Sequence, residues 1–375
     1  MEYTKTFNNL KSLFNSEEKM IEIPDSEIRI HNIDFSSDEP EIVFSQTSDI
    51  MFTENRSFSY PVFAPRDRKS NKVILLLHGL NERSWIKYLV WAFYLAENTG
   101  SYVILFPISF HINRSPASWK DPRAMIPIMK ERNSNSEELE MSSFANVALS
   151  NRLTEDPLRF FNSGYQTSTD IVKLLSAVRD GKHSVIPQTS KINIFAYSIG
   201  AFLGEIIMMG NPGKLFTESK LFIFCGGSVF SNMQGTSKLI MDSLAFRKVY
   251  SYYLNDFEHS LTGKSQIVEF FRSSQIGMAF RSMIDIERLK SFRENILKSL
   301  RNQVYTVSML QDRVIPSRGV VSTLSGILNK KSVEIWDFPY PYTHENPFPI
   351  FDNQMSGKVD LWFEKVFSKA SAYLA

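Results

Sequence analysis

The stretch that most constrains the fold is a continuous apolar run, Lys72-Val-Ile-Leu-Leu-Leu-His-Gly79. A run without polar alternation is typical of a parallel strand that is buried on both faces. Residues 84–98 follow with apolar side chains at helical spacing, and residues 102–108 form a second apolar run. This order predicts a β-α-β unit, and therefore a parallel sheet that is covered by helices.

The same alternation of apolar runs and helical patterns returns later in the chain. Strands are predicted at 192–197, 221–224, 304–310 and 332–336, and helices at 167–180, 199–209, 317–328 and 357–375. We therefore expect an α/β fold with a mostly parallel central sheet and helices on both faces.

Three segments do not follow this alternation. Residues 1–70 are polar and rich in Ser and Asn, and we interpret them as irregular structure followed by antiparallel edge strands. Residues 111–164 are too long for an ordinary connection and are predicted to be an insertion, with one helix around 136–152. Residues 229–302 hold several amphipathic helical stretches, which we interpret as a helical cap. One α/β-domain over 71–375 with two insertions explains the pattern better than two tandem domains.

Composition limits the classes of function. A net charge of +2 without a long basic run argues against a nucleic-acid partner. The single cysteine, Cys225, excludes an internal disulfide and a multi-thiolate metal site. We find no His/Asp cluster at metal-ligand spacing and no glycine-rich phosphate loop, so no metal and no cofactor is predicted. Apolar runs such as 89–96 are too short to span a membrane and the N-terminus does not resemble a signal peptide, so we expect a soluble, cytoplasmic protein of unknown oligomeric state.

The run at 192–197 leads directly into Ala196-Tyr197-Ser198-Ile199-Gly200, and a helical pattern follows at once. This is the shape of a nucleophile elbow, in which a serine stands on a sharp strand-to-helix turn. Small residues two positions before and after the serine are needed because the two backbones approach closely there. The motif alone is a weak signal, so its value depends on partners elsewhere in the chain.

A serine hydroxyl is a poor nucleophile at neutral pH, so it needs a nearby imidazole, which in turn needs a carboxylate. Because sites in parallel sheets form where the strands end, we looked for His and Asp/Glu directly after predicted strands. Asp312 follows the strand at 304–310, and His344 follows the strand at 332–336. Asp337 and Glu345 are rival acids near strand ends. The other histidines fit poorly, and those at positions 31, 183 and 259 are expected at the surface.

The order Ser198, Asp312, His344 resembles that of the α/β-hydrolase superfamily, in which nucleophile, acid and histidine follow one another in this way. The resemblance covers roughly residues 71–110, 165–228 and 303–375. The chain departs from the commonest elbow at Ala196, where Gly is usual. The resemblance implies a catalytic triad of Ser198, Asp312 and His344.

It also implies an oxyanion hole near the His78-Gly79 pair. The backbone N–H of Leu80 or of Asn81 would serve with that of Ile199, and the choice between Leu80 and Asn81 stays open. His78 itself is expected to shape the loop and not to act in catalysis.

Two further side chains follow the strand at 102–108 and are candidates for substrate binding. His111 and Arg114 could reach the cleft, where Arg114 could pair with a substrate carboxylate. A structural salt bridge of Arg114 is at least as good an interpretation.

Together these features predict a serine hydrolase that cleaves an ester-like bond of a small molecule through an acyl-enzyme, of carboxylesterase or lipase type. One alternative is an acyltransferase of the same fold, in which an alcohol or amine replaces water. The other is a non-catalytic binding protein of this fold, which the complete triad disfavours.

Overall fold

The computed structural model describes residues 1–39, 41, 42, 44, 49–66, 70–135, 139–189, 191–351 and 355–375. These residues form a nine-stranded sheet in the order β1-β2-β3-β5-β4-β6-β7-β8-β9. The strands are β1 (Met20–Glu22), β2 (Ile28–Ser36), β3 (Ser57–Pro65), β4 (Lys72–Leu77), β5 (Tyr102–Leu105), β6 (Lys191–Tyr197), β7 (Leu221–Phe224), β8 (Val304–Met309) and β9 (Val333–Trp336). The pairs β1–β2, β2–β3 and β3–β5 are antiparallel, and the other neighbours are parallel. The predicted fold class, a mostly parallel sheet with antiparallel strands at its N-terminal edge, is confirmed.

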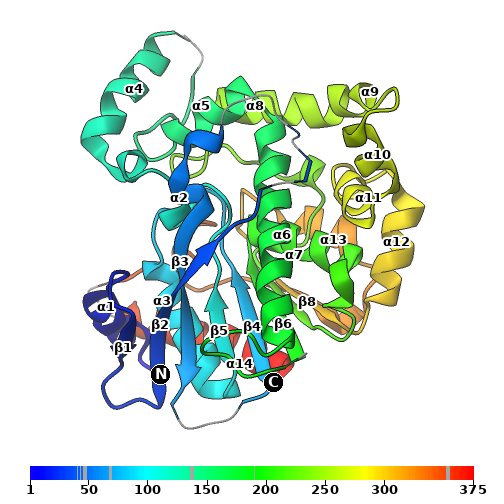
Figure 1. The fold of residues 1–375 in the computed structure, drawn as a ribbon. Helices are drawn as coiled ribbons and strands as arrows, with labels where there is room; N and C mark the ends of the chain where they lie inside the picture. Colours follow the sequence, from blue (N-terminus) through cyan, green and yellow to red (C-terminus); the bar gives the residue numbers. More distant parts are fainter. Residues whose placement is uncertain are drawn as a thin grey trace.

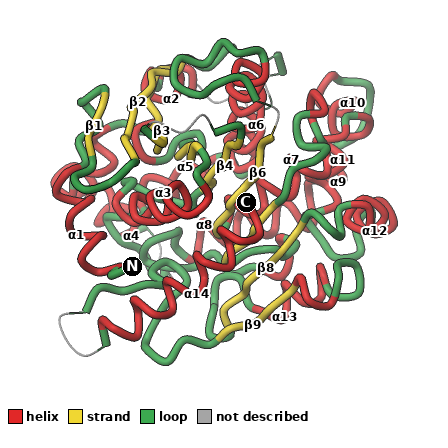
Figure 2. Tube along the Cα trace, turned by 90° about the horizontal axis from the view of Figure 1, so that it is seen from below, coloured by secondary structure: helices red, strands yellow, loops and turns green. Residues whose placement is uncertain are grey.

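Helices lie on both sides of this sheet. Figure 2 shows α1, α3 and α14 on one side of the band of strands and α6 and α7 on the other. The α-helices are α1 (Tyr3–Leu13), α2 (Thr53–Arg56), α3 (Ile86–Thr99), α4 (Pro122–Ser134), α5 (Val147–Glu155), α6 (Leu158–Arg179), α7 (Ile199–Gly210), α8 (Ser243–Ser251), α9 (Phe257–Ser260), α10 (Gln266–Ser273), α11 (Gln275–Ser282), α12 (Lys290–Ser299), α13 (Ser317–Leu324) and α14 (Ser356–Leu374). Within the ranges described above, no helix is both long and apolar enough to cross a bilayer.

Strand β4 explains why the apolar run has no polar alternation. Val73, Leu75 and Leu77 belong to the core on the side of α6 and α7, whereas Ile74 and Leu76 belong to the core on the side of α3 and α14. All five side chains are fully buried. Each contributes roughly 1.5–3 kcal/mol relative to an exposed side chain, so a polar substitution on either face would be costly.

The segments predicted as insertion and cap gather around one end of the sheet and along one flank. Residues 111–164 form η2 (Ile112–Arg114), η3 (Ala117–Lys120), α4, α5 and the start of α6. Residues 229–302 form α8 to α12. In Figure 1, α4, α5 and α8 lie beyond the end of the sheet, and α10 to α12 lie on the flank beside α7. Helix α5 packs on α8, and α11 packs on α7.

The helices predicted over 136–152, 167–180 and 317–328 were wrong in their limits, and helices α1, α2 and α4 were missed. Helix α6 begins at Leu158, well before the predicted start at 167. Of the helix predicted over 136–152, residues 136–138 lie outside the described residues, and the observed helix is α5.

Helix α1 occupies residues that were expected to be irregular. It is held by tertiary contacts: the Tyr3 hydroxyl donates to the Phe348 carbonyl at 3.0 Å, and the Thr4 N–H donates to Asp360 at 3.0 Å. Such contacts leave no local signal in the sequence.

Candidate active site

The turn between β6 and α7 holds Ser198 in an unusual backbone conformation, with φ 59° and ψ −125°. A non-glycine residue at positive φ is strained and persists only where its surroundings enforce it. Gly200 is part of that enforcement, because a Cβ there would lie 2.6 Å from the Leu77 carbonyl oxygen and 2.7 Å from that of His78. The small residue predicted from the elbow pattern is therefore required by the approach of α7 to β4.

The structure brings Ser198, His344 and Asp312 together. Ser198 Oγ lies 2.6 Å from His344 Nε2, and His344 Nδ1 lies 2.7 Å from Asp312 Oδ2. Because a carboxylate can only accept, Nδ1 carries the imidazole proton and Nε2 presents its lone pair to the serine hydroxyl. Each residue is only 4% exposed.

The second carboxylate oxygen of Asp312 is occupied by the backbone that follows β8. Oδ1 accepts from the N–H groups of Val314 and Ile315 at 2.9 and 2.8 Å. These bonds fix the carboxylate plane, so that Oδ2 is directed to His344. The turn is formed by Asp312-Arg-Val-Ile-Pro316, directly after β8.

The two rival acids have other partners. Asp337 accepts from the Gln311 side-chain amide at 2.8 Å and from the Tyr342 hydroxyl at 2.9 Å. Glu345 accepts from the Ser237 hydroxyl, which brings the segment 229–302 to the edge of the cleft. Among the described residues, neither the Asp337 nor the Glu345 carboxylate forms a hydrogen bond with the His344 imidazole.

Neighbours on β6 and α3 fix the loop that carries His344. The Tyr197 ring stacks on the imidazole at a centroid distance of 5.6 Å, and the Tyr197 hydroxyl donates to the His344 carbonyl. Lys87 donates to the Glu345 carbonyl at 2.9 Å, and its ammonium lies 4.8 Å from the centre of the Tyr197 ring. This role of Tyr197 and Lys87 was not predicted, since neither residue stands directly after a strand.

His78 shapes the loop after β4, as predicted for it. Its Nδ1–H donates to the Gly79 carbonyl and its Nε2 accepts from the Ile108 N–H, both at 2.8 Å. Burial, with His111 nearby, holds the pKa of His78 well below its usual range, so the imidazole is neutral. Both ring nitrogens are thus used within the protein.

The three predicted oxyanion-hole residues meet around Ser198. Leu80 and Asn81 line a polar cleft with Ser198 and His344, and Ile199 lines an adjoining pocket with Ser198. Within the described part of the chain, the backbone N–H groups of Leu80, Asn81 and Ile199 have no hydrogen-bond partner. All three remain able to donate to a bound group.

The side chain of Asn81 has a function that the sequence did not reveal. Asn81 has a φ of 59°, and its amide donates to the carbonyls of Ala145 at 2.9 Å and Leu239 at 2.8 Å. It therefore joins both long inserted segments to the turn beside Ser198.

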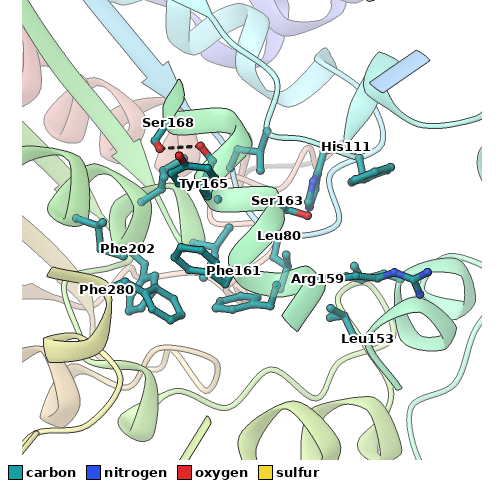
Figure 3. A pocket seen from close by; sticks show the side chains of 18 of the residues that line it. Leu80, His111, Leu153, Arg159, Phe161, Ser163, Tyr165, Ser168, Phe202 and Phe280 are labelled. Atoms are coloured by element: carbon teal, nitrogen blue, oxygen red, sulfur yellow. Dashed lines mark hydrogen bonds between the residues drawn. The ribbon is translucent and has the colours of Figure 1, made fainter. Parts of the chain in front are cut away.

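Three hollows adjoin at Leu80. The first is the polar cleft, whose wall includes Lys87 and Glu345. The second is an apolar pocket that reaches Ser198 and is lined by side chains such as Phe230 and Met241. The third, the apolar cavity shown in Figure 3, is lined mainly by phenylalanine, leucine and isoleucine side chains from α5, α6, α7 and α11.

Of the two predicted substrate contacts, only His111 reaches one of these hollows. It lines the apolar cavity of Figure 3. Arg114 is fully buried and lines none of the three hollows. Its guanidinium pairs with Asp170 at 2.8 Å, donates to the carbonyls of Asn55 and Pro107, and lies over the Phe58 ring. The structural salt bridge is therefore the correct interpretation of Arg114.

His183 also differs from its expected surface position. It is partly buried, its Nδ1 accepts from the Val185 and Ile186 N–H groups, and its Nε2 lies 2.8 Å from the Tyr60 hydroxyl. It holds the loop before β6 and takes no part in the site. Among the described side chains, no three His, Cys, Asp or Glu residues are grouped as metal ligands.

A family of unknown function, DUF6051, matches the chain over residues 39–375. The chain belongs to this family. No curated protein sequence matches it.

Solved structures with a similar fold include several esterases. An esterase from Pyrobaculum calidifontis is 12% identical, with 100% of this chain and 90% of that chain covered and a TM-score of 0.44. A peroxisomal alpha-beta-hydrolase from Saccharomyces cerevisiae is 12% identical, with coverage of 93% and 90% and a TM-score of 0.44. A carboxyl esterase from Tuber melanosporum is 10% identical, with coverage of 97% and 97% and a TM-score of 0.44.

A mostly parallel sheet with a serine at a strand-to-helix turn, followed along the chain by the Asp and the His, has the arrangement of the α/β-hydrolase superfamily. The observed sheet and the turn at Ser198 agree with the predicted resemblance to this superfamily.

Proposed function

We propose that this protein is a serine hydrolase that cleaves an ester-like bond of a small molecule. The observation that carries the proposal is the hydrogen-bonded series from Ser198 through His344 to Asp312, at 2.6 and 2.7 Å. This is the geometry that a nucleophile, a general base and its orienting carboxylate require. The strained elbow at Ser198 supports it, because strain of this kind is concentrated at functional sites.

In the first half of the proposed reaction, the Ser198 hydroxyl proton passes to His344 Nε2 as Oγ attacks the acyl carbon. The carbonyl oxygen becomes an oxyanion that accepts from the N–H of Ile199 and from that of Leu80 or Asn81. Loss of one such donor typically raises the barrier by about 3 kcal/mol. The tetrahedral species then expels the alkoxide, which takes the proton from His344 and leaves as the alcohol.

The second half returns the enzyme to its starting state. His344 accepts a proton from water as the water oxygen attacks the acyl carbon, and the acyl–Oγ bond breaks as that proton reaches Ser198. The carboxylic acid leaves. In both halves Asp312 stabilises the imidazolium and keeps its own charge.

Labelling with a fluorophosphonate tests the nucleophile. We expect the wild-type protein to form one adduct at Ser198, and Ser198→Ala to form none. Ser84→Ala is the matched control, because Ser84 lines the same polar cleft and is not part of the hydrogen-bonded series. A folded wild-type protein that forms no adduct at Ser198 would refute the proposal.

Ester hydrolysis is the second readout. Ser198→Ala should lower kcat by a factor on the order of 10⁴ or more on any ester that the wild type cleaves. Partition of the acyl group between water and an added alcohol then separates hydrolysis from acyl transfer.

A further inference from the structure

The apolar cavity of Figure 3 adjoins the pocket that contains Ser198. The two share Leu80, Phe160 and Ile199 in their walls. An acyl group attached to Ser198 that outgrows the first pocket would extend toward these three side chains. The cavity is thus the next space available to an acyl chain longer than the first pocket can hold.

The cavity accepts a narrow apolar group. Its volume is about 70 Å³, and Phe161, Phe202 and Phe280 are among its walls. The space is therefore suited to a slender chain and not to a bulky ring system.

His111, a residue of the cavity wall, carries a buried polar atom that has no partner in the described part of the chain. His111 is 4% exposed and lines the cavity, and its Nε2 has no hydrogen-bond partner among the described residues. Its Nδ1 lies 2.9 Å from the Ser109 carbonyl, which can only accept, so Nδ1 carries the proton and Nε2 the lone pair. Burial lowers the pKa of His111 to about 4, and the imidazole is therefore a neutral acceptor at pH 7. Buried acceptors normally have a partner, so this one calls for an explanation.

The charges near His111 do not favour an anionic ligand. Arg152 is held by both oxygens of Asp49 at 2.9 and 3.0 Å. Arg159 pairs with Glu155 and lies 3.3 Å from Asp49. In Figure 3 the Arg159 side chain runs away from the phenylalanine rings. The two guanidinium groups are thus neutralised by the protein itself.

We propose that the acyl part of the substrate is a neutral apolar chain that ends in a hydroxyl, and that this hydroxyl donates to His111 Nε2. A hydroxyl suits the site better than an ammonium, because a charge would lose its hydration in this apolar space. A hydroxyl can also accept a hydrogen bond, and Ser163 lines the same cavity. Nε2 is itself buried in this structure, so a hydroxyl reaches it only after a side-chain shift of the kind common at ligand sites. The proposal rests on the proposed function and assigns specificity, not chemistry, to His111.

Matched pairs of 4-nitrophenyl esters test this assignment. One member of each pair is an ω-hydroxyalkanoate, and in the other a methyl group replaces the hydroxyl. Several chain lengths are tested, since the proposal specifies the end group of the acyl chain and leaves its length open. We expect kcat/KM to favour the hydroxy ester by about tenfold at the best length. His111→Phe should abolish or reverse that ratio, because the imidazole acceptor that the hydroxyl would use is then lost. Ser168→Ala is the control: Ser168 lines the cavity but donates to the Tyr165 carbonyl at 2.7 Å, so its loss should leave the ratio unchanged.

The outcomes separate this inference from the proposed function. If the wild type hydrolyses both series but favours the methyl ester at every length, the role of His111 is refuted and the triad is untouched. If His111→Phe does not fold, the wild-type ratio alone decides. If Ser198 forms no fluorophosphonate adduct and no ester is cleaved, both proposals fail.

Discussion

Gly200→Ala sets two opposing effects against each other at the elbow. In a helix, Ala is more favourable than Gly by about 1 kcal/mol, so propensity alone predicts a more stable protein. The structure predicts the opposite. An added Cβ would lie 2.6 Å from the Leu77 carbonyl oxygen and 2.7 Å from that of His78, where ordinary contact begins at 3.4 Å. Helix α7 would have to move away from β4 by about 0.8 Å, against backbone atoms that cannot rotate aside.

Overpacking of this kind costs roughly 3 kcal/mol, which exceeds the gain in propensity and leaves a net loss of about 2 kcal/mol. The same movement displaces Ser198 from the turn at Leu80, and a misplacement near 1 Å costs on the order of 10²-fold in rate. Guanidinium unfolding measures the first effect, and the rate of fluorophosphonate labelling measures the second. We expect a lower unfolding midpoint and labelling that is slower by about two orders of magnitude.

Gly357→Ala is the matched control, since Gly357 lies in α14 and nothing stands within 4 Å of its added Cβ. It should raise the free energy of unfolding by up to about 1 kcal/mol through propensity alone. A Gly200→Ala protein that unfolds at the wild-type midpoint or above it would refute the steric reasoning.

Three further predictions concern buried polar groups. Because the pKa values of His78 and His111 are depressed in the folded protein, to about 4 for His111, the unfolded chain binds protons below about pH 6.5 that the folded chain does not. The free energy of unfolding should therefore fall between pH 6.5 and 4, by up to about 1.4 kcal/mol per pH unit for each histidine, and a flat pH profile of denaturant midpoints would contradict this. Glu205 is buried, and neither of its carboxylate oxygens has a partner among the described residues. Burial raises the pKa of Glu205, so the stability that the folded protein has with this side chain protonated is lost as pH rises through the folded pKa. Glu205→Met should raise the free energy of unfolding by about 1–3 kcal/mol at pH 8 and by less below pH 4; a less stable variant at pH 8 would count against it. Arg114→Met should lower the free energy of unfolding by about 3–5 kcal/mol, because it leaves Asp170 buried without its cation. Adding Asp170→Asn to the same chain should recover part of this loss. An unchanged denaturant midpoint for Arg114→Met would show that the ion pair does not stabilise the fold.

The parts of the fold that could be predicted are those with a local physical cause. A strand buried on both faces must be apolar throughout, and for this reason Leu221–Phe224 was predicted at its observed limits. The elbow was visible because the approach of two backbones excludes side chains at Gly200. Asp312 and His344 could be nominated because the strands before them end at the same edge of the sheet. Whether they act as a triad stays a prediction until Ser198 is labelled.

The features that were missed depend on contacts between distant segments. Residues 160–164, Phe-Phe-Asn-Ser-Gly, contain the residue types that mark loops, yet they lie inside α6. Phe161 packs there against Phe271 and Phe280 from α10 and α11, at centroid distances of 4.6 Å in both cases. Aromatic burial of this size outweighs the weak helix propensity of the local sequence.

The residues around Ser198 fall into two groups, those whose backbone would take part in catalysis and those that only line the cavity. Leu80 and Ile199 belong both to the wall of the apolar cavity and to the backbone that would hold the oxyanion, so a substitution that moves either backbone alters the rate as well as the pocket. His111 and Phe280 line the cavity and are not part of the hydrogen-bonded series, and changes there should alter which acyl group is accepted while the chemistry is kept. We therefore expect acyl preference to be changed most readily at positions on α6, α11 and the loop after β5. Of these positions only His111 could be nominated from the sequence, because it follows a predicted strand; those on α6 and α11 line the cavity only once the three segments have packed together.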